Sequence, residues 1–446
     1  MKIRNKVVII ALIVAMLFGT AACGSNQSGG QAPAPDTSNV SNDSNTSDTS
    51  SAASGSTIKI GYVAPFTGVN SDTTTSTKWA NDLYLNQINN VNGGIEVDGK
   101  KLPVEIIYRD SQSDPSIASD VATQLVLEQN VDMLIGAWTP NTTVPVAAVA
   151  ERYNIPCICP NSPAQAWKAG LPENTDYQWC AGIMFDLGAF IGEVVHLWDT
   201  IDFNKKVGLM LDNGTDGATI AGVIGGMAAA AGYTVVDPGR YPTDTNDYSA
   251  MINLFKQEDV SVIYGSMTTA NYATFLKQCA QLSYTPILAT GGLACHYDYT
   301  VETIDSIVGY DGAGQYVCCE CFWCPEYGYG DDYLGMSAAD LVAKWESDNG
   351  TQAPEDMGFS LACDYLIQAV FNQAGTVDKA TVRDTLSKCT INSLFGKQVA
   401  DGNVYFCPVT VVQWVKGDKY KYEPNIVSAS TMPQVTTSPF VPYGTK

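Results

Sequence analysis

The residues with the greatest capacity for chemistry are the cysteines. Of the 13 in the chain, four stand close together in the run Cys318-Cys319-Glu320-Cys321-Phe322-Trp323-Cys324. A structural zinc site usually takes two close pairs from separate segments, and adjacent cysteines span a tetrahedron poorly. We therefore expect disulfides or free buried thiols here, with no metal and no cofactor. Cys157 and Cys159 lie two residues apart, which places both on one face of a strand and in the core.

Histidine-based catalysis has little support in the sequence. The chain has two histidines, of which His196 lies in a predicted helix and is expected to be structural. His296 follows Cys295 at the edge of a predicted cleft loop, where a ligand contact stays open, but sequence neighbours are not a catalytic pair, because nucleophile and base must meet around a substrate. No nucleophile elbow, phosphate loop or metal-binding helix motif is present. We expect that the protein is not an enzyme.

The N-terminal segment predicts export. A cationic start leads into the apolar run 7–18, which is too short to span a bilayer comfortably. Thr20-Ala21-Ala22-Cys23 resembles the lipobox of bacterial lipoproteins, so residues 1–22 are predicted to be a lipoprotein signal peptide and Cys23 the lipidation site, with ordinary secretion as the alternative. The composition of residues 23–56 predicts a disordered tether. This organisation suits a protein anchored on the outer face of a cell membrane of Gram-positive type.

The net charge excludes one class of partner. The chain carries 46 acidic and 24 basic residues, for a formal charge of −22, and the part after the signal segment has no basic cluster. Binding of nucleic acid depends on concentrated positive charge. We therefore expect no nucleic-acid partner, and the acidic surplus is sufficiently explained by solubility.

The remaining chain predicts an α/β fold in two parts. Short β-rich runs alternate with helical stretches, a pattern typical of mostly parallel sheets flanked by helices. One set of predicted strands runs from 58–63 to 155–159, and a second from 207–211 to 286–289. About 390 residues exceed the usual size of a single core. We predict one lobe from 57–180 with part of 300–390, and another from 181–299 with part of 391–446.

The loops after the predicted strands are the candidate ligand site, because ligands of parallel sheets bind beyond the carboxyl ends of the strands. Several segments with recognisable motifs follow one another along the chain: Pro65-Phe66-Thr67-Gly68, Asn92-Gly93-Gly94-Ile95, Arg109 to Pro115, Asn154-Ile155-Pro156, Asp212-Asn213-Gly214 and Tyr241 to Ile252. Taken in order, they resemble the type I periplasmic binding proteins of the leucine/isoleucine/valine-binding class, the substrate-binding lipoproteins of branched-chain amino acid ABC transporters. The resemblance implies two α/β lobes, joined by three crossovers, that close around a ligand.

The resemblance also implies which residues bind the ligand. In the first lobe a carboxylate would be held by donors around Trp138, Thr139, Asn161 and Ser162, although Thr139 as a helix cap and Trp138 as a core residue remain open. The second lobe departs from the family, because Thr290 to Ala294 contains no acidic residue to pair with an ammonium group. Either Asp212 or Asp216 replaces it, or the ligand has no ammonium; Asp216 as a simple helix N-terminal acid is the structural alternative. The second-lobe candidates are Asp212, Asp216, Ser266, Met267 (a core filler in the alternative) and Gly292.

The function implied by the resemblance is binding without chemistry. We expect an extracytoplasmic receptor of an ABC importer, monomeric, that captures a small amino acid or a related carboxylate and delivers it to a membrane permease. A ligand-sensing module of the same fold is the alternative. Sensors of this fold usually carry a transmembrane helix and an output domain after the binding domain, and no apolar span follows here, which favours the importer.

Overall fold

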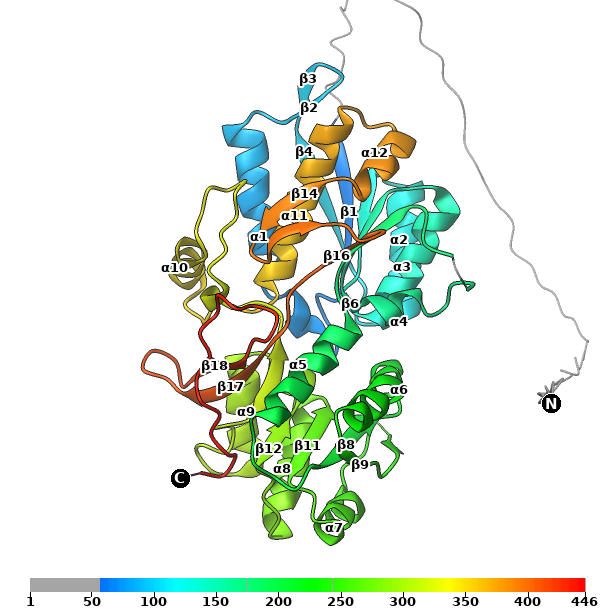
Figure 1. Cartoon of the computed structure of the whole chain (residues 1–446). Helices are drawn as coiled ribbons and strands as arrows, with labels where there is room; N and C mark the ends of the chain where they lie inside the picture. The colour runs from blue at the N-terminus through cyan, green and yellow to red at the C-terminus, as the bar shows by residue number, and fades with distance from the viewer. Residues whose placement is uncertain (1–56, 174, 243, 446) are drawn as a thin grey trace, which may run out of the picture. The chain divides into compact units, whose positions relative to one another are not determined.

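The computed structural model describes residues 57–173, 175–242 and 244–445, and the side chains of residues 215, 216 and 293 are also outside the description (Figure 1). The predicted signal peptide, lipidation site and tether therefore lie outside the described residues. The described residues belong to one compact unit. Among the described helices, none is both long and apolar enough to cross a membrane.

The first sheet has six strands, all parallel, in the order β16-β7-β6-β5-β1-β4. Parallel neighbours need crossover connections, and helices supply them. The strands point their carboxyl ends the same way, so the loops that follow them gather at one edge. Their bounds are β1 Ile58–Ala64, β4 Val104–Asp110, β5 Met133–Ile135, β6 Cys157–Pro163, β7 Cys180–Phe185 and β16 Val404–Phe406.

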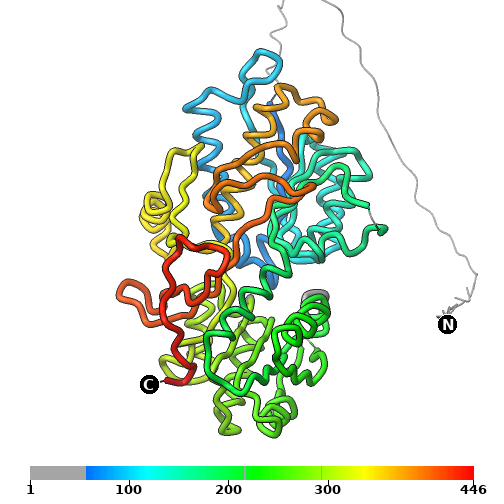
Figure 2. The backbone as a smooth tube through the Cα atoms, viewed as in Figure 1, coloured from blue at the N-terminus to red at the C-terminus, as the bar shows by residue number. Residues whose placement is uncertain are grey.

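The second sheet has eight strands, in the order β10-β8-β11-β12-β13-β17-β18, with β9 also paired to β8. Its first part is parallel, whereas β13, β17 and β18 pair antiparallel. Figure 2 shows the C-terminal chain, in orange and red, returning beside the yellow-green segment that contains β13. The bounds are β8 Lys206–Asp212, β9 Thr234–Val236, β10 Arg240–Tyr241, β11 Val262–Ser266, β12 Leu288–Thr290, β13 Cys318–Cys321, β17 Thr410–Lys416 and β18 Tyr422–Ser428.

Helices cover the sheets in layers (Figure 1). On the first sheet α1 and α11 pack on one face, and α2 and α3 pack on the other. Asp114 caps α2 by accepting from the backbone N–H groups of Ser116 and Ile117, with Pro115 at the first helical position, as the sequence predicts. The helices are α1 Thr77–Leu85, α2 Pro115–Leu127, α3 Pro140–Tyr153, α4 Ala164–Lys168, α5 Leu187–Asp199, α6 Thr215–Ala230, α7 Ser249–Gln257, α8 Thr269–Gln281, α9 Asp298–Val308, α10 Ala338–Asn349, α11 Met357–Ala374 and α12 Lys379–Leu386.

Two faces of the first sheet bury two separate apolar clusters. Ile58, Ile60 and Tyr62 of β1 belong to a large cluster that continues into the second sheet, whereas Val63 points to the opposite face and a smaller cluster. This alternation follows the two-residue period of a strand. Two short hairpins complete the fold, β2 Ile95–Val97 with β3 Lys100–Leu102, and β14 Thr390–Ser393 with β15 Gly396–Val399.

Along the described chain, the path passes between the two sheets three times: after β7, after β13 and after β16. The predicted α/β fold with parallel sheets flanked by helices is confirmed. Among the strands that were not predicted from the sequence are Cys180–Phe185 and Cys318–Cys321. The first belongs to the first sheet and the second to the second sheet. The division into two moving lobes at the boundaries given above stays a prediction.

Candidate functional site

A cavity of about 80 Å³ lies where the carboxyl ends of strands from both sheets meet. Loops after β5 and β6 line one side, and β11, β13 and the loop after β12 line the other. This is the position at which open parallel sheets bind ligands. Its polar lining comes from Thr73, Thr139, Asn161, Thr219, Tyr264, Ser266, His296 and Glu320.

Glu320 is the principal charged group of this cavity. It sits in β13 with 0 % of its surface exposed, and neither carboxylate oxygen has a hydrogen-bond partner among the described residues. The nearby hydroxyl of Tyr264 also lacks one. Burial raises the pKa of Glu320, while its own backbone N–H, the charge of His296 and the Tyr264 hydroxyl counteract part of that rise. A buried carboxylate without a hydrogen bond is costly, so Glu320 is favoured in its neutral form unless the donor or cation of a ligand approaches it.

Glu320 places an acidic side chain beside the loop Thr290 to Ala294, which contains none. β13 lies next to β12 in the sheet, with Cys318 paired to Thr290. Glu320 therefore projects into the same cavity that the loop Thr290 to Ala294 borders, although it is far from that loop in sequence. The signal that sequence reasoning missed was the single acidic residue inside the buried run 317–324.

A buried ion pair lies beside Glu320. His296 Nδ1 is 2.7 Å from Glu355 Oε1, and both side chains are buried. Burial by itself would lower the pKa of His296, but Glu355 and then Glu320 raise it above its usual value. With His296 protonated, its charge balances that of Glu355, so ionised Glu320 leaves one negative charge in excess. This arrangement favours a cationic group in the ligand.

The first-sheet side offers neutral donors. Thr139 occupies the N-cap position of α3 without making a side-chain capping bond, and its hydroxyl lies 3.2 Å from that of Thr142. Thr139 and Asn161 have φ angles of 142° and 49°, a region that non-glycine residues rarely adopt and that is common at ligand sites. The N-terminus of α3 carries partial positive charge. This side is suited to an anionic group.

The remaining wall is aromatic and aliphatic. The rings of Phe185 and Phe322 stack with centroids 4.4 Å apart, and Phe190 lies 5.3 Å from Phe185. Leu187 and Ile220 extend the same wall. Apolar surface of this kind gains free energy by covering an apolar part of a ligand.

The structure places the residues predicted for the site in two groups. Thr139, Asn161, Ser266 and Gly292 line the cavity. At Gly292, φ is +56° and a Cβ would approach Ser266 Cα to 3.1 Å, so a side chain there would strain the cavity wall. Ligand contact by any of the predicted residues stays a prediction.

Four other predicted residues, all with described side chains, are not part of the cavity lining: Trp138, Ser162, Asp212 and Met267. Trp138 is fully buried, edge-on to Phe359, and Met267 belongs to the core. Ser162 is buried, with no partner for its hydroxyl among the described residues. The Asp212 carboxylate accepts the N–H of Gly214 in the turn before α6, and the side chain of Asp216 is outside the description. His296, left open as a ligand contact, lines the cavity.

The histidine and cysteine predictions have clear structural outcomes. His196 Nδ1 lies 2.9 Å from Ser428 Oγ, which links α5 to β18 and agrees with a structural role. The twelve described cysteines are buried free thiols, including those of the run 318–324. Cys157 and Cys159 lie in the core, as predicted.

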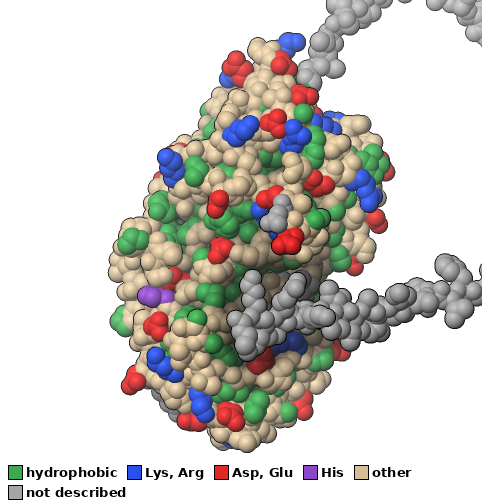
Figure 3. Space-filling model, turned by 45° about the vertical axis from the view of Figure 1, so that its right-hand side comes forward, with side chains coloured by type: hydrophobic (Ala, Val, Ile, Leu, Met, Phe, Trp, Pro, Cys, Tyr) green, Lys and Arg blue, Asp and Glu red, His purple; other side chains and the backbone are tan. Residues whose placement is uncertain are grey.

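Figure 3 shows acidic and basic side chains interspersed over the visible face of the described residues.

The sequence matches one family model, described as "Periplasmic binding protein", over residues 57–419. A curated relative, the Leu/Ile/Val-binding protein homolog 8 of Brucella abortus, is 27% identical over 108 residues, which are 24% of this chain and 26% of the relative. The match thus spans about a quarter of that relative's length.

Solved structures share the fold at lower identity. The branched-chain amino acid transporter substrate-binding protein of Streptococcus pneumoniae, in complex with isoleucine, superposes with a TM-score of 0.64 at 17% identity, covering 84% of this chain and 100% of the other. A solute-binding protein of an ABC transporter from Rhodopseudomonas palustris, in complex with 3,4-dihydroxybenzoic acid, gives a TM-score of 0.66 at 17% identity, covering 84% and 99%. At this identity the likeness shows the fold alone.

Proposed function

Because the chain belongs to the periplasmic binding protein family, we propose that it is the extracytoplasmic solute-binding receptor of an ABC importer. Its solute is a small amino acid with an apolar side chain, captured by closure of two lobes. The observation that carries the solute class is the buried, unpartnered carboxylate of Glu320 in the cavity wall. The transporter of branched-chain amino acids in S. pneumoniae and the Leu/Ile/Val-binding homolog of B. abortus support this class.

Each part of such a solute has a counterpart in the cavity. Its ammonium group would pair with Glu320, and its carboxylate would meet Thr139, Asn161 and the N-terminus of α3. Its side chain would pack on the wall that contains Phe185 and Phe322. Because the two charged ends face different sheets, a bound zwitterion would favour the closed arrangement of the lobes by its differential affinity.

The size of the cavity limits the solute. A cavity needs about 10–15 Å³ for one water by the same measure, so about 80 Å³ is room for several water-sized groups. A small amino acid fits this scale, whereas a peptide or a sugar oligomer would require the walls to separate.

An aromatic carboxylic acid is the second candidate. The cluster of Phe185, Phe190 and Phe322 favours an aromatic ring, and the raised pKa of Glu320 would let it donate a proton in a hydrogen bond to a ligand without ammonium. The R. palustris protein in complex with 3,4-dihydroxybenzoic acid has the same fold.

The cellular setting completes the proposal. Lipidation at Cys23 would hold the protein on the outer face of the membrane, and residues 23–56 would serve as the tether. The closed complex would dock on a membrane permease as its partner, with the receptor acting as a monomer.

A thermal-shift and calorimetric screen tests the proposal. The ligands are leucine, isoleucine, valine and phenylalanine, their deaminated keto acids, and hydroxybenzoates, because a ligand of the folded state raises the melting temperature according to its concentration and Kd. Stabilisation by amino acids and not by keto acids is expected. Equal binding of keto acids would contradict the ammonium site, binding of hydroxybenzoates alone would favour the second candidate, and no binding by the whole panel would remove support for the receptor.

A further inference from the structure

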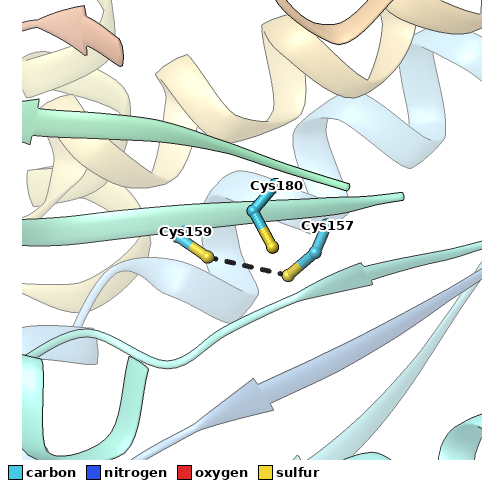
Figure 4. Close-up of side chains that lie close together, drawn as sticks. All are labelled: Cys157, Cys159 and Cys180. Carbon is cyan, nitrogen blue, oxygen red and sulfur yellow. Dashed lines mark hydrogen bonds between the residues drawn. The ribbon is translucent and has the colours of Figure 1, made fainter. Parts of the chain in front are cut away.

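Three cysteines meet at the amino ends of β6 and β7, at the other end of these strands from the ligand cavity. Cys157 and Cys159 extend from β6 and Cys180 from β7, with Cys157 and Cys180 directly paired in the sheet. The Sγ atoms of Cys157 and Cys159 are 3.7 Å apart, and the three Sγ atoms all lie within 4.8 Å of one another. Figure 4 shows the three side chains converging between the two strands.

The surroundings of these thiols are apolar. Cys157 and Cys159 are fully buried and Cys180 is 3 % exposed, within the smaller apolar cluster that includes Trp167 and Tyr177. Their other hydrogen bonds are long contacts to backbone oxygens, from Cys157 to Ile158 at 3.7 Å and from Cys180 to Ala147 at 3.8 Å. Thiols are weak donors, so these contacts contribute little to the fold.

We propose that Cys157, Cys159 and Cys180 form a binding site for one thiophilic ion in three-coordinate geometry. With metal–sulfur bonds of about 2.3 Å, three sulfurs around one ion are about 4 Å from one another. The distances in this cluster bracket that spacing. Small side-chain rotations are therefore sufficient to bring the three sulfur atoms around an ion without moving the strands.

The number of ligands and the burial select the class of ion. Among the described residues the cluster contains three ligands and no fourth, which disfavours zinc, because structural zinc is held tetrahedrally. Soft ions such as Cu(I) accept thiolates alone, but Cu(I) with three thiolates has two negative charges, which an apolar site disfavours. A trivalent metalloid gives a neutral complex, so we expect arsenite to be the better occupant.

The binding reaction with arsenite balances without a redox partner. Arsenous acid has three As–OH groups, and each thiol replaces one of them. Three S–H and three As–O bonds break, three As–S bonds form, and the released protons and hydroxyl groups leave as three water molecules. The oxidation states of sulfur and arsenic do not change, and the product crosslinks β6 to β7.

The test uses the full chain, reduced and kept free of oxygen so that disulfides do not form. Arsenite, Cu(I) and zinc are added separately, excess ion is removed by desalting, and the bound ion is measured by mass spectrometry together with the melting temperature. We expect one arsenic per chain and a higher melting temperature. Peptide mapping after alkylation should show that arsenite protects Cys157, Cys159 and Cys180, a readout that requires no variant.

Variants then assign the site. Cys159→Ala and Cys180→Ala should each lower arsenite affinity at least tenfold, whereas Cys279→Ala, a buried cysteine of α8, and the double variant Cys321→Ala/Cys324→Ala should retain it. The proposal is overturned if the wild type binds no arsenite or Cu(I) at one per chain, if protection maps to other cysteines, or if zinc binds more tightly than both. It is also overturned if folded Cys159→Ala and Cys180→Ala bind as the wild type does.

Discussion

The cavity wall built on the first sheet and the wall built on the second sheet present different polar groups. The first offers neutral side chains, Thr139 and Asn161, and the N-terminus of α3. The second offers a buried carboxylate, Glu320, beside the ion pair of His296 and Glu355. The two walls therefore differ in the charge that they can carry. Under the proposed function, this difference would distinguish the two ends of a zwitterion, with each sheet contacting one of them.

Removal of the Glu320 carboxylate should cause the largest loss of ligand affinity among the changes to the two walls. In Glu320→Gln the shape is kept and the charge is lost, so we expect affinity for leucine-like amino acids to fall about 30-fold or more, or about 2 kcal/mol. Calorimetry measures it, with Glu302→Gln of α9 as a control that keeps wild-type affinity. Unchanged binding by folded Glu320→Gln would show that the ammonium lies elsewhere.

Low pH should weaken the binding of an amino acid because it protonates Glu320. The pKa of folded Glu320 is raised above that of the unfolded chain, so its contribution to stability without ligand is present at low pH and is lost as pH rises toward the folded pKa. An ammonium ligand pairs with the ionised form of Glu320, so its affinity should be higher at pH 8 than at pH 5. Titrations across this range should give a flat profile in Glu320→Gln; a matching slope in both proteins would assign the dependence to another group.

Removal of a polar side chain from the first-sheet wall should weaken ligand binding independently of the ammonium contact. Asn161→Gly tolerates the φ angle of 49° and removes the amide, so we expect affinity to fall about tenfold, or about 1.5 kcal/mol, the value of one hydrogen bond to a charged group. The fold-loss for leucine should be equal in the wild type and in the Glu320→Gln background, because independent contacts add. A loss seen in only one of the two backgrounds would show that Asn161 does not act independently of Glu320.

A substitution in the aromatic wall should cause the smallest loss of ligand affinity. Phe322→Leu keeps apolar volume but removes the stack on Phe185, and we expect about threefold weaker binding of phenylalanine and a smaller change for valine. Phe203→Leu, which removes a stack on Tyr233 instead, is the matched control. Equal losses in the two variants would point to a change in stability rather than in the cavity.

Much of the fold was predictable because its signals are local. The strand at Ile58 to Ala64, the capped start of α2 at Asp114 and the helix Ala338–Asn349 follow from alternation and capping within a few residues. The strand Cys318–Cys321 was not predicted, because its run of cysteines was considered as chemistry and lacks the β-branched residues typical of strands.

The site was only partly predictable. Loops after strands were expected to border the ligand, and Thr139, Asn161, Ser266 and Gly292 do line the cavity. Glu320 was missed because its role depends on which strand lies next to β12. That neighbour is β13, which pairs with β12 on one side and with the C-terminal β17 on the other.

By itself the sequence determined the alternation of strands and helices, the acidic balance, and the placement of polar loops after apolar strands, since these depend on neighbours a few residues apart. The tertiary structure decided which loops share a cavity, that Glu320 is buried without a partner, and that Cys180 joins Cys157 and Cys159. These features depend on strand order and register, which bring together residues far apart in the chain, and no local pattern encodes them.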